Sequence, residues 1–161
     1  MTATASRRTP RRFDSTQQEC YLNLWRTYDR LRMLEDELFQ RHELTAQQYN
    51  ALRLLRAEHP ATLPTLTLAS KLVSHAPDIT RLVDRLEQRG LVARQRMPGN
   101  RRVVQVGITA VGLAMLKELD QPVRDCHQKQ LGHLSTAQLQ SLSDLLRTAR
   151  QPHEADESAW R

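Results

Sequence analysis

The sequence predicts a mainly α-helical fold with a small β component: six helices and one two-stranded β-hairpin. Along most of the chain, apolar residues recur at steps of three and four, the spacing that places side chains on one face of a helix. The alternation typical of strands is confined to a short stretch after Gly90. Gly and Pro are scarce, with 5 and 7 among 161 residues, which argues against a β-sandwich or a disordered chain.

A long amphipathic helix is expected from about Ser15 to His42, with Ser15 or Thr16 as its N-cap. Its apolar face comprises Tyr21, Leu24, Trp25, Tyr28, Leu31, Leu34, Leu38 and Phe39. Thr45 is expected to cap the second helix, within "TAQQYNALRLLRAE", because Gln48 stands at the third helical position, as in a capping box. The core face of this second helix consists of Tyr49, Leu52 and Leu55.

A short third helix is predicted over "TLTLASKLV", from Thr65 to Val73. Pro60 and Pro64 end the preceding helix and are expected to form a loop before this one. The residues that the third helix is expected to bury are Leu66, Leu68, Ala69 and Leu72.

A fourth helix is expected after Ser74 or His75, with Pro77 and Asp78 in its first turn and Gly90 at its C′ position. Its apolar face comprises Ile79, Leu82, Val83 and Leu86. The next residues, "LVARQR" and "RRVVQVGIT", are typical of two strands, and the turn "MPGN" between them completes a hairpin.

Two helices complete the chain. Thr109 is expected to cap the first of them, over about 110–131, and Pro122 to bend it. Its apolar stripe is Val111, Met115, Leu116, Leu119 and Val123. Ser135 begins the last helix, whose apolar seam is Leu139, Leu142, Leu145 and Leu146.

This order predicts that the third and fourth helices form a helix-turn-helix and that the hairpin is a wing beside it. The first and the last two helices carry more apolar surface than one thin lobe can hide, which predicts pairing with a second copy about a two-fold axis. The expected organisation is a basic flexible arm (1–14), a helical dimerisation region (15–44 and 109–150), a winged helix-turn-helix DNA-binding lobe (45–108) and a flexible tail (151–161).

The charge balance suits a partner that carries phosphates, since 24 basic against 18 acidic residues give a net charge of +6. Arginines crowd residues 76–106, where they are Arg81, Arg85, Arg89, Arg94, Arg96, Arg101 and Arg102. One interpretation is that the helix and the hairpin reach the same polyanion. The other is that these arginines are solvated on an ordinary α+β edge.

In a helix-turn-helix, the second helix enters the major groove by its N-terminal end. The residues expected to contact bases there are Ala76, Pro77, Asp78, Thr80 and Arg81, those expected at backbone phosphates are Ser74 and Arg85, and those of the wing expected at the minor groove are Asn100, Arg101 and Arg102. Arg81 suits a guanine edge and Asp78 a cytosine amine. The alternative is a solvated helix face on which these charges pair at i,i+3 and i,i+4.

The segment "TRLVDRLEQRGLVARQRMPGNRRVVQVGITAVGLAML" resembles the winged helix-turn-helix core of the MarR family of bacterial transcription regulators, and "LTAQQYNALRLLR" resembles the family's second helix. The resemblance covers about 18–150. It implies an obligate two-fold dimer that binds pseudo-palindromic operators as a repressor, released by a small phenolic or aromatic effector or by oxidation. The wing departs from the family's Asp-x-Arg, because Asn100 stands at the aspartate position and Arg102 at the arginine position, so Arg102 loses a charge-assisted bond.

The same resemblance places an effector site where the first, second and fifth helices meet the DNA-binding lobe. The candidate residues for this site are Trp25, Tyr28, Arg32, Tyr49 and Arg53. Aromatic faces with a guanidinium suit an aromatic carboxylate. The alternative is that the aromatic residues belong to the core and the dimer interface.

Two cysteines suggest a second trigger. Cys20 lies early in the first helix, near the reactive cysteine of peroxide-sensing relatives, and Cys126 is its candidate resolving partner across the dimer. The alternative is a pair of inert thiols, since two cysteines make no disulfide framework.

Other classes of function have little support in the sequence. No phosphate loop, nucleophile elbow or metal-ligand spacing is present, so no enzyme, cofactor or metal site is predicted. No apolar run can span a bilayer and the N-terminus lacks the apolar core of a signal peptide, so a cytoplasmic protein, associated with the nucleoid when bound to DNA, is expected. A non-specific architectural DNA-binding protein stays open as an alternative.

Overall fold

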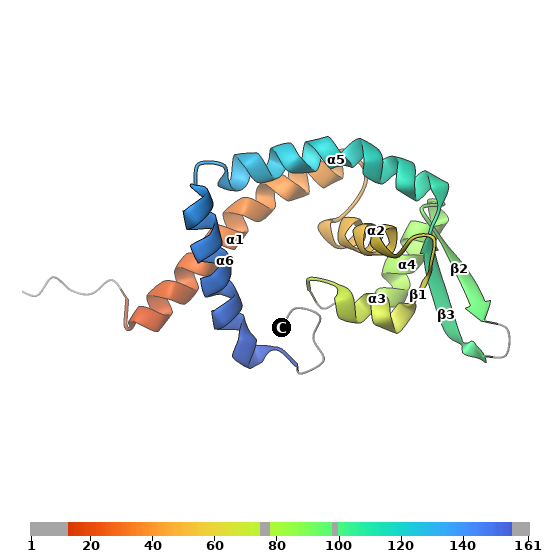
Figure 1. Ribbon diagram of the computed structural model, residues 1–161, viewed down its shortest axis with the longest axis horizontal. Coiled ribbons are helices and arrows are strands. Elements are labelled where there is room, and N and C mark those ends of the chain that lie inside the picture. The colour runs from red at the N-terminus through yellow and green to blue at the C-terminus, as the bar shows by residue number, and fades with distance from the viewer. Residues whose placement is uncertain (1–12, 75–77, 98–99, 156–161) are drawn as a thin grey trace, which may run out of the picture. The chain divides into compact units, whose positions relative to one another are not determined.

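The computed structural model describes residues 13–74, 78–97 and 100–155. Its elements, labelled in Figure 1, are α1 (Thr16–Gln40), α2 (Ala46–Glu58), β1 (Leu63–Pro64), α3 (Thr65–Lys71), α4 (Ile79–Gln88), β2 (Val92–Met97), β3 (Asn100–Ile108), α5 (Ala110–Leu131), α6 (Thr136–Arg150) and a 3₁₀ turn, η1 (Gln151–His153). The predicted fold, mainly helical with six helices and a small sheet, is confirmed. The chain divides into two compact units, Met1–Met33 and Leu34–Arg161.

The described part of the first unit is the N-terminal portion of α1. Ser15 is its N-cap, because the hydroxyl of Ser15 accepts from the amide of Gln18 at 3.0 Å. The predicted apolar face forms, and it is exposed, as the side chains of Tyr21, Leu24, Trp25 and Tyr28 show. The rings of Tyr21 and Trp25 contact each other, with centroids 6.2 Å apart.

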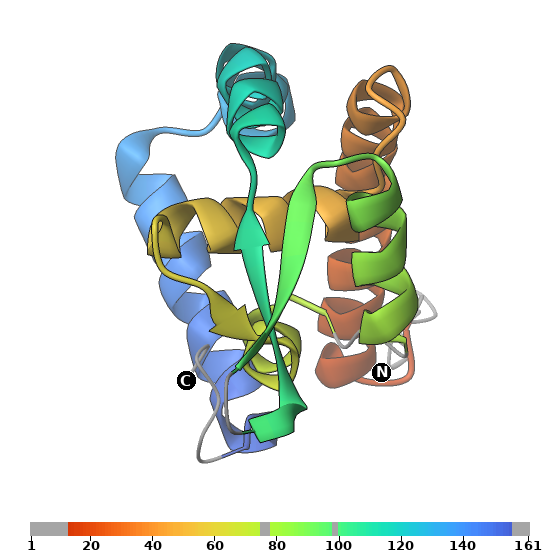
Figure 2. The ribbon, with the colours of Figure 1, turned by 90° about the vertical axis from the view of Figure 1, so that its right-hand side faces the viewer.

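The second unit holds the hydrophobic core. Figure 2 shows α2 crossing behind the sheet. Residues from α2 to α5 and from the end of α1 contribute to the core. Its most deeply buried side chains are Leu52, Leu55, Leu68, Val83, Leu86, Leu91, Val92, Val106, Leu116 and Leu119. Burial of about ten such side chains, each worth roughly 1.5 to 3 kcal/mol, fixes how the helix-turn-helix sits against the sheet.

Several helix ends follow local rules that the sequence made visible. Thr45 and Ser135 each form a capping box, with Gln48 and Gln138 as the reciprocal partners. Thr109 caps α5 by accepting from the amide of Gly112 at 3.1 Å. The fourth helix differs from the prediction, because Asp78 is its N-cap and not part of its first turn.

The sheet has a third strand that the sequence analysis read as a loop. β1 pairs antiparallel with β3, so that the strand order is β1-β3-β2 and Pro64 lies opposite Gln105. The hydroxyl of Thr65 donates to the carbonyl of Val104 at 3.1 Å and strengthens this junction. β1 lies at an edge of the sheet, where a proline, which has no amide to donate, is tolerated.

Two residues predicted to be buried are exposed. Leu66 is 79% exposed, because α3 has seven residues and buries the side that carries Leu68, two positions away and therefore on the opposite face. Val111 is 58% exposed, since α5 buries the face of Leu116, Leu119 and Val123 instead. The third helix also ends at Lys71, two residues earlier than predicted.

Within the described residues, no helix combines the length and the apolarity that a membrane-spanning segment requires.

The turn after α1 contains a strained residue. Glu43 has φ = 53°, in the left-handed region, and the amides of Glu43 and Leu44 donate back to the carbonyls of Gln40 and Phe39, both at 3.0 Å. This is a Schellman motif, in which glycine is the favoured residue at the position that Glu43 occupies. It ends the helix two residues before the predicted limit at His42.

We therefore expect Glu43→Gly to raise the free energy of unfolding by about 0.5 to 1 kcal/mol. The substitution removes a Cβ from a left-handed position, which stabilises the fold, and part of this gain is lost because glycine increases the entropy of the unfolded chain. Urea unfolding at fixed protein concentration measures this. Glu43→Ala is the matched control, since it removes the carboxylate but keeps the Cβ, and should bring no such gain. A glycine variant that is less stable than the alanine variant would contradict the interpretation.

Candidate nucleic-acid interface

The recognition element is α4, which follows α3 after a short connection. Leu82, Val83 and Leu86 bury one face of α4 in the core. The opposite face carries Thr80, Arg81 and Arg85, all exposed. The helix therefore presents a polar, basic face to solvent from a buried apolar base, as a helix that enters a DNA groove requires.

Arg81 and Asp78 form a unit at the start of α4. The Asp78 carboxylate accepts from the Arg81 amide at 2.9 Å and lies 3.5 Å from the Arg81 Nε. The Arg81 side chain is nevertheless 71% exposed, so its guanidinium can exchange this weak i,i+3 pair for another acceptor. The Arg81–Asp78 pair is one of the i,i+3 pairs expected if this were only a solvated helix face, but it leaves Arg81 on the surface.

The other residues predicted to contact the major groove and the DNA backbone are described only in part. Ala76 and Pro77 lie outside the described residues. Ser74 is exposed, and its hydroxyl accepts from the side-chain amide of Gln47 at 3.1 Å. A second bond, from the Val73 amide to the Asn50 side chain at 3.0 Å, also holds the start of the α3–α4 connection against α2.

The wing is formed by β2 and β3, next to α4 in Figure 1. The pairing is regular from Val92 to Arg96, and a bulge lies between Arg96 and Met97. Asn100 begins β3, and the side chains of Asn100, Arg101 and Arg102 lie outside the described part.

Arg94 has a role that its sequence position alone did not indicate. Its guanidinium pairs with the carboxylates of Asp84 and Glu87, the latter at 3.1 Å, and donates to the carbonyl of Thr80 at 3.1 Å. Its amide also donates to Glu87, at 3.0 Å. Arg94 is thus a brace between the wing and α4, and the interpretation that every arginine here faces a polyanion does not hold for it. An arginine in a strand beside two acids spaced i,i+3 on the preceding helix is the signal that could have indicated this.

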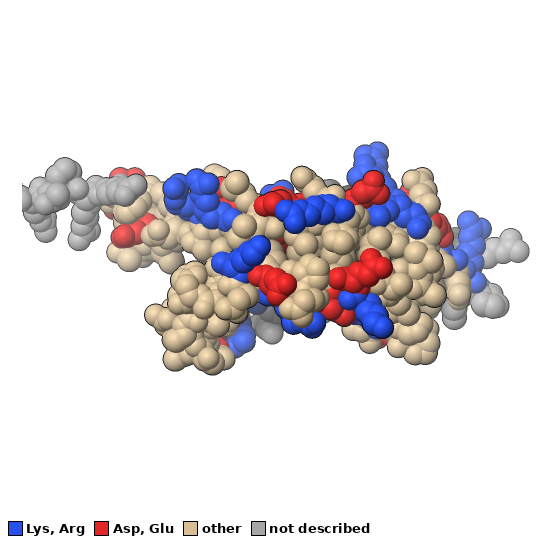
Figure 3. Space-filling model, turned by 90° about the horizontal axis from the view of Figure 1, so that it is seen from above, with Lys and Arg blue, Asp and Glu red and all other residues tan. Residues whose placement is uncertain are grey.

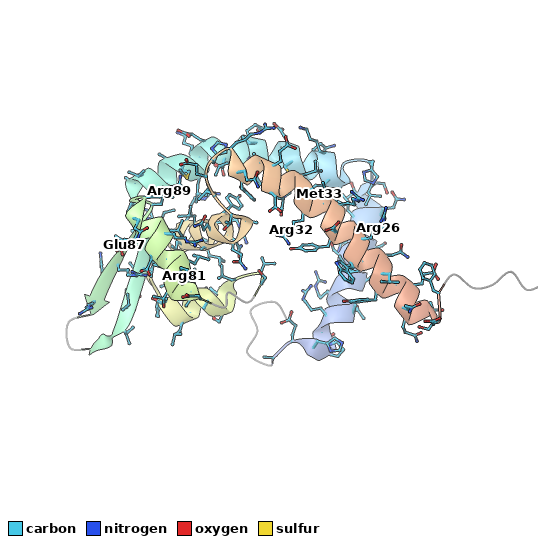
Figure 4. The ribbon with its side chains drawn as sticks, turned by 180° about the vertical axis from the view of Figure 1, so that it is seen from behind. Arg26, Arg32, Met33, Arg81, Glu87 and Arg89 are labelled. Atoms are coloured by element: carbon cyan, nitrogen blue, oxygen red, sulfur yellow. The ribbon has the colours of Figure 1, made fainter. Side chains whose placement is uncertain are left out.

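Arg89 is also engaged within the lobe, through the carbonyls of His42 and Glu43. Figure 4 shows Arg81 and Arg89 at opposite ends of α4, with Glu87 between them. The view of Figure 3 shows acidic and basic side chains interspersed, so the net positive charge does not gather on that face. Arg81 and Arg85, by contrast, are exposed on the outer side of α4.

The candidate effector residues divide between the two units. Trp25, Tyr28 and Arg32 are exposed side chains of the first unit. In the second unit, Tyr49 is partly buried and stacks on Phe39 with ring centroids 4.6 Å apart, and Arg53 is exposed. Burial raises the pKa of Tyr49, and the nearby cations of Arg56 and Arg53 oppose that rise, so its phenol is neutral at physiological pH.

The two cysteines differ in environment. Cys20 is exposed and Cys126 is buried. Burial raises the pKa of the Cys126 thiol and the carboxylate of Glu35 raises it further, which keeps this thiol protonated and poorly reactive. Among the described residues, no group of three or more His, Cys, Asp or Glu side chains is arranged to hold a metal.

A pocket that the sequence did not indicate lies between the α1–α2 turn and α4. Its volume is about 440 Å³. The lining residues are Gln40, Glu43, Leu44, Thr45, Gln48, Arg85, Gln88 and Arg89.

Comparison with known proteins agrees with this geometry. The model of the MarR family matches residues 44–104, which span α2 to β3. The crystal structure of a MarR transcription factor from Planctomyces limnophilus is 56% identical, covers 85% of this chain and 99% of its own, and superposes with a TM-score of 0.68. The chain belongs to the MarR family. This is a family of DNA-binding transcription regulators rather than of enzymes.

Two more distant MarR-type proteins are informative. The HTH-type transcriptional repressor IacR of Pseudomonas putida is 25% identical over 135 residues, which are 83% of this chain and 80% of IacR. BpsR of Bordetella bronchiseptica, whose DNA binding is regulated by 6-hydroxynicotinic acid, is 25% identical, with coverage of 89% of this chain and 99% of that one and a TM-score of 0.74.

The brace at Arg94 can be tested by stability. Arg94→Met should destabilise the MarR-family lobe by about 1 to 2 kcal/mol, because two partly exposed carboxylates and one carbonyl lose their donor. The matched control is Arg96→Met, two residues further along β2, an exposed arginine for which the described residues show no ion pair; it should stay within about 0.5 kcal/mol of wild type. Equal unfolding midpoints in urea for the two variants would show that the brace contributes nothing.

Proposed function

We propose that this MarR-family regulator is a sequence-specific repressor that binds double-stranded DNA as a homodimer and is released by a small aromatic or phenolic effector. The observation that carries the proposal is the outer face of α4, where Thr80, Arg81 and Arg85 are exposed above a fully buried apolar face. The brace from Arg94 to Asp84 and Glu87 supports it, because helix and wing then approach DNA as one rigid body.

Sequence reading is assigned to the start of α4. The exposed guanidinium of Arg81 contacts a guanine through O6 and N7, and Asp78 both orients it and accepts from a cytosine amine. Ala76 and Pro77 contact thymine methyl groups, and Thr80 completes the surface that faces the bases. Each bidentate contact of this type discriminates against a wrong base by about 1 to 3 kcal/mol.

Contacts with the DNA backbone and the minor groove are assigned to the flanking residues. Ser74 and Arg85 contact phosphates on either side of the groove. Asn100, Arg101 and Arg102 of the wing reach the adjacent minor groove, where a narrow groove favours a guanidinium. These contacts supply affinity and register rather than sequence information.

The proposed dimer pairs the regions 15–44 and 109–150 with those of a second copy. Its support is the apolar surface left on the terminal helices. Tyr21, Trp25 and Tyr28 are each about 60% exposed, and no residue of α6 is buried although Leu142, Leu145 and Leu146 form its seam. Isologous association buries such a surface on both protomers at once.

The proposed effector contacts Trp25, Tyr28, Arg32, Tyr49 and Arg53. Aromatic side chains and a guanidinium are the groups that recognise an aromatic hydroxy acid, the class to which the regulator of BpsR belongs. The neutral phenol of Tyr49 can donate to a carboxylate. Oxidation at Cys20 is the less favoured trigger, because its proposed partner Cys126 is buried and has a raised pKa.

Arg81→Ala tests this function. The variant should lose at least about tenfold in affinity for an operator selected by the wild-type protein, and much less on random duplex DNA, because only the base contact distinguishes the two. Binding isotherms on both duplexes over a range of salt concentrations measure the effect.

The control is Lys71→Ala, which removes one positive charge at the Lys71–Glu58 pair and should lower both affinities by the same small factor. Equal losses on operator and random DNA in the Arg81 variant would exclude base reading and favour an architectural DNA-binding protein.

A further inference from the structure

One guanidinium joins the ends of two helices. Arg89 is the C-cap residue of α4, and its Nη2 donates to the carbonyl of His42 at 3.1 Å while its Nη1 donates to the carbonyl of Glu43. Those carbonyls lie just beyond the last turn of α1. The Arg89 side chain is only 29% exposed, and the Glu43 carboxylate lies 3.9 Å from it.

Both helix ends are closed by the same kind of motif. At α1, the amides of Glu43 and Leu44 return to Gln40 and Phe39. At α4, the amide of Gly90 returns to Glu87 at 2.8 Å and that of Leu91 to Leu86 at 3.0 Å, with Gly90 at φ = 68°. Each motif fixes the path of its own chain, and Arg89 connects the two fixed ends.

A pocket lies beside this connection. The pocket of about 440 Å³ lies between the α1–α2 turn and the C-terminal half of α4, and Arg89 is part of its wall. The two bonds of Arg89 therefore join the helix ends at the edge of this pocket, beside the core in which Leu44 and Leu86 are buried.

We propose that Arg89 is a positioning residue that couples the end of α1 to the recognition helix and so sets the tilt at which α4 enters DNA. The proposal rests on the proposed function, in which α4 reads bases. The core holds the middle of α4 through Leu82, Val83 and Leu86, while Arg89 holds its C-terminal end.

Arg89 lies far enough from Arg81 along α4 for a small tilt of the helix to move Arg81. Arg81 and Arg89 are eight residues apart, which is about 12 Å along a helix axis. Hydrogen bonds to base edges tolerate errors of a few tenths of an ångström, so a small tilt of α4 disturbs the contacts of Arg81. A shift at the end of α1 reaches the base-reading residues by the same route, which gives α1 a direct influence on operator affinity.

The test compares Arg89→Met, Arg89→Lys and the control Lys71→Met. Lys71 also joins two helices of the lobe, α3 and α2, through a partly exposed charge, its pair with Glu58. Each protein is titrated with an operator duplex selected from a random library by the wild-type protein, and with random duplex, well below its unfolding temperature.

Arg89→Met should reduce the ratio of operator to random-DNA affinity by about tenfold, within the usual range of coupling between sites, and Arg89→Lys, which can keep one bond, should lie between it and wild type. Lys71→Met should leave the ratio unchanged. Amide exchange gives a second measurement without DNA: the amides of Leu44 and Leu91 should both exchange faster in Arg89→Met than in Lys71→Met.

A ratio in both Arg89 variants equal to that of Lys71→Met would overturn the coupling and leave the proposed function standing. So would unchanged exchange at Leu44 and Leu91. Should Arg89→Met fail to fold, the lysine variant decides alone. Absence of any operator preference in the wild-type protein would overturn the proposed function itself.

Discussion

The recognition helix cannot hold itself in place, and the rest of the DNA-binding lobe depends on how it is held. α4 has ten residues, fewer than an isolated helix needs for stability in water. Its conformation therefore comes from burial of Leu82, Val83 and Leu86 and from bonds at its ends. A helix fixed in this way by its surroundings can leave its outer face to a partner without a cost in folding.

The arginines around α4 divide by the same constraint. Arg94 pairs with carboxylates within the lobe and fixes the wing, and Arg89 donates to backbone carbonyls and fixes the end of α4. Arg81 and Arg85 lie outside, one weakly paired and one exposed. Arginines that look alike in the sequence thus fall into two groups, those that brace the lobe and those that stay exposed. Only their exposure and their partners in the structure distinguish the two groups. The braces fix the helix on which the outer arginines, proposed to contact DNA, are carried.

Much of the fold could be predicted because its signals are local. Thr45 was recognisable from a glutamine three residues later, Ser135 from its place before the last apolar seam, and Gly90 from its place after an apolar periodicity. β1 could not be predicted, because a two-residue strand exists only through pairing with β3, some forty residues away. Leu66 was misassigned because a helix as short as α3 shows no clear periodicity. The candidate site was predictable to the same extent. The position of Arg81 in α4 followed from local sequence, whereas the partners of Arg94 and Arg89 are tertiary contacts that local sequence does not indicate.

In the proposed two-fold dimer, two copies of α4 face adjacent major grooves. Selection of fragmented genomic DNA by the purified full-length protein, followed by sequencing of the bound fragments, tests this arrangement most directly. We expect one shared motif made of two inverted half-sites, with centres about one helical turn, roughly 10 base pairs, apart. Bound fragments without a common motif, or with a single unpaired half-site, would contradict it.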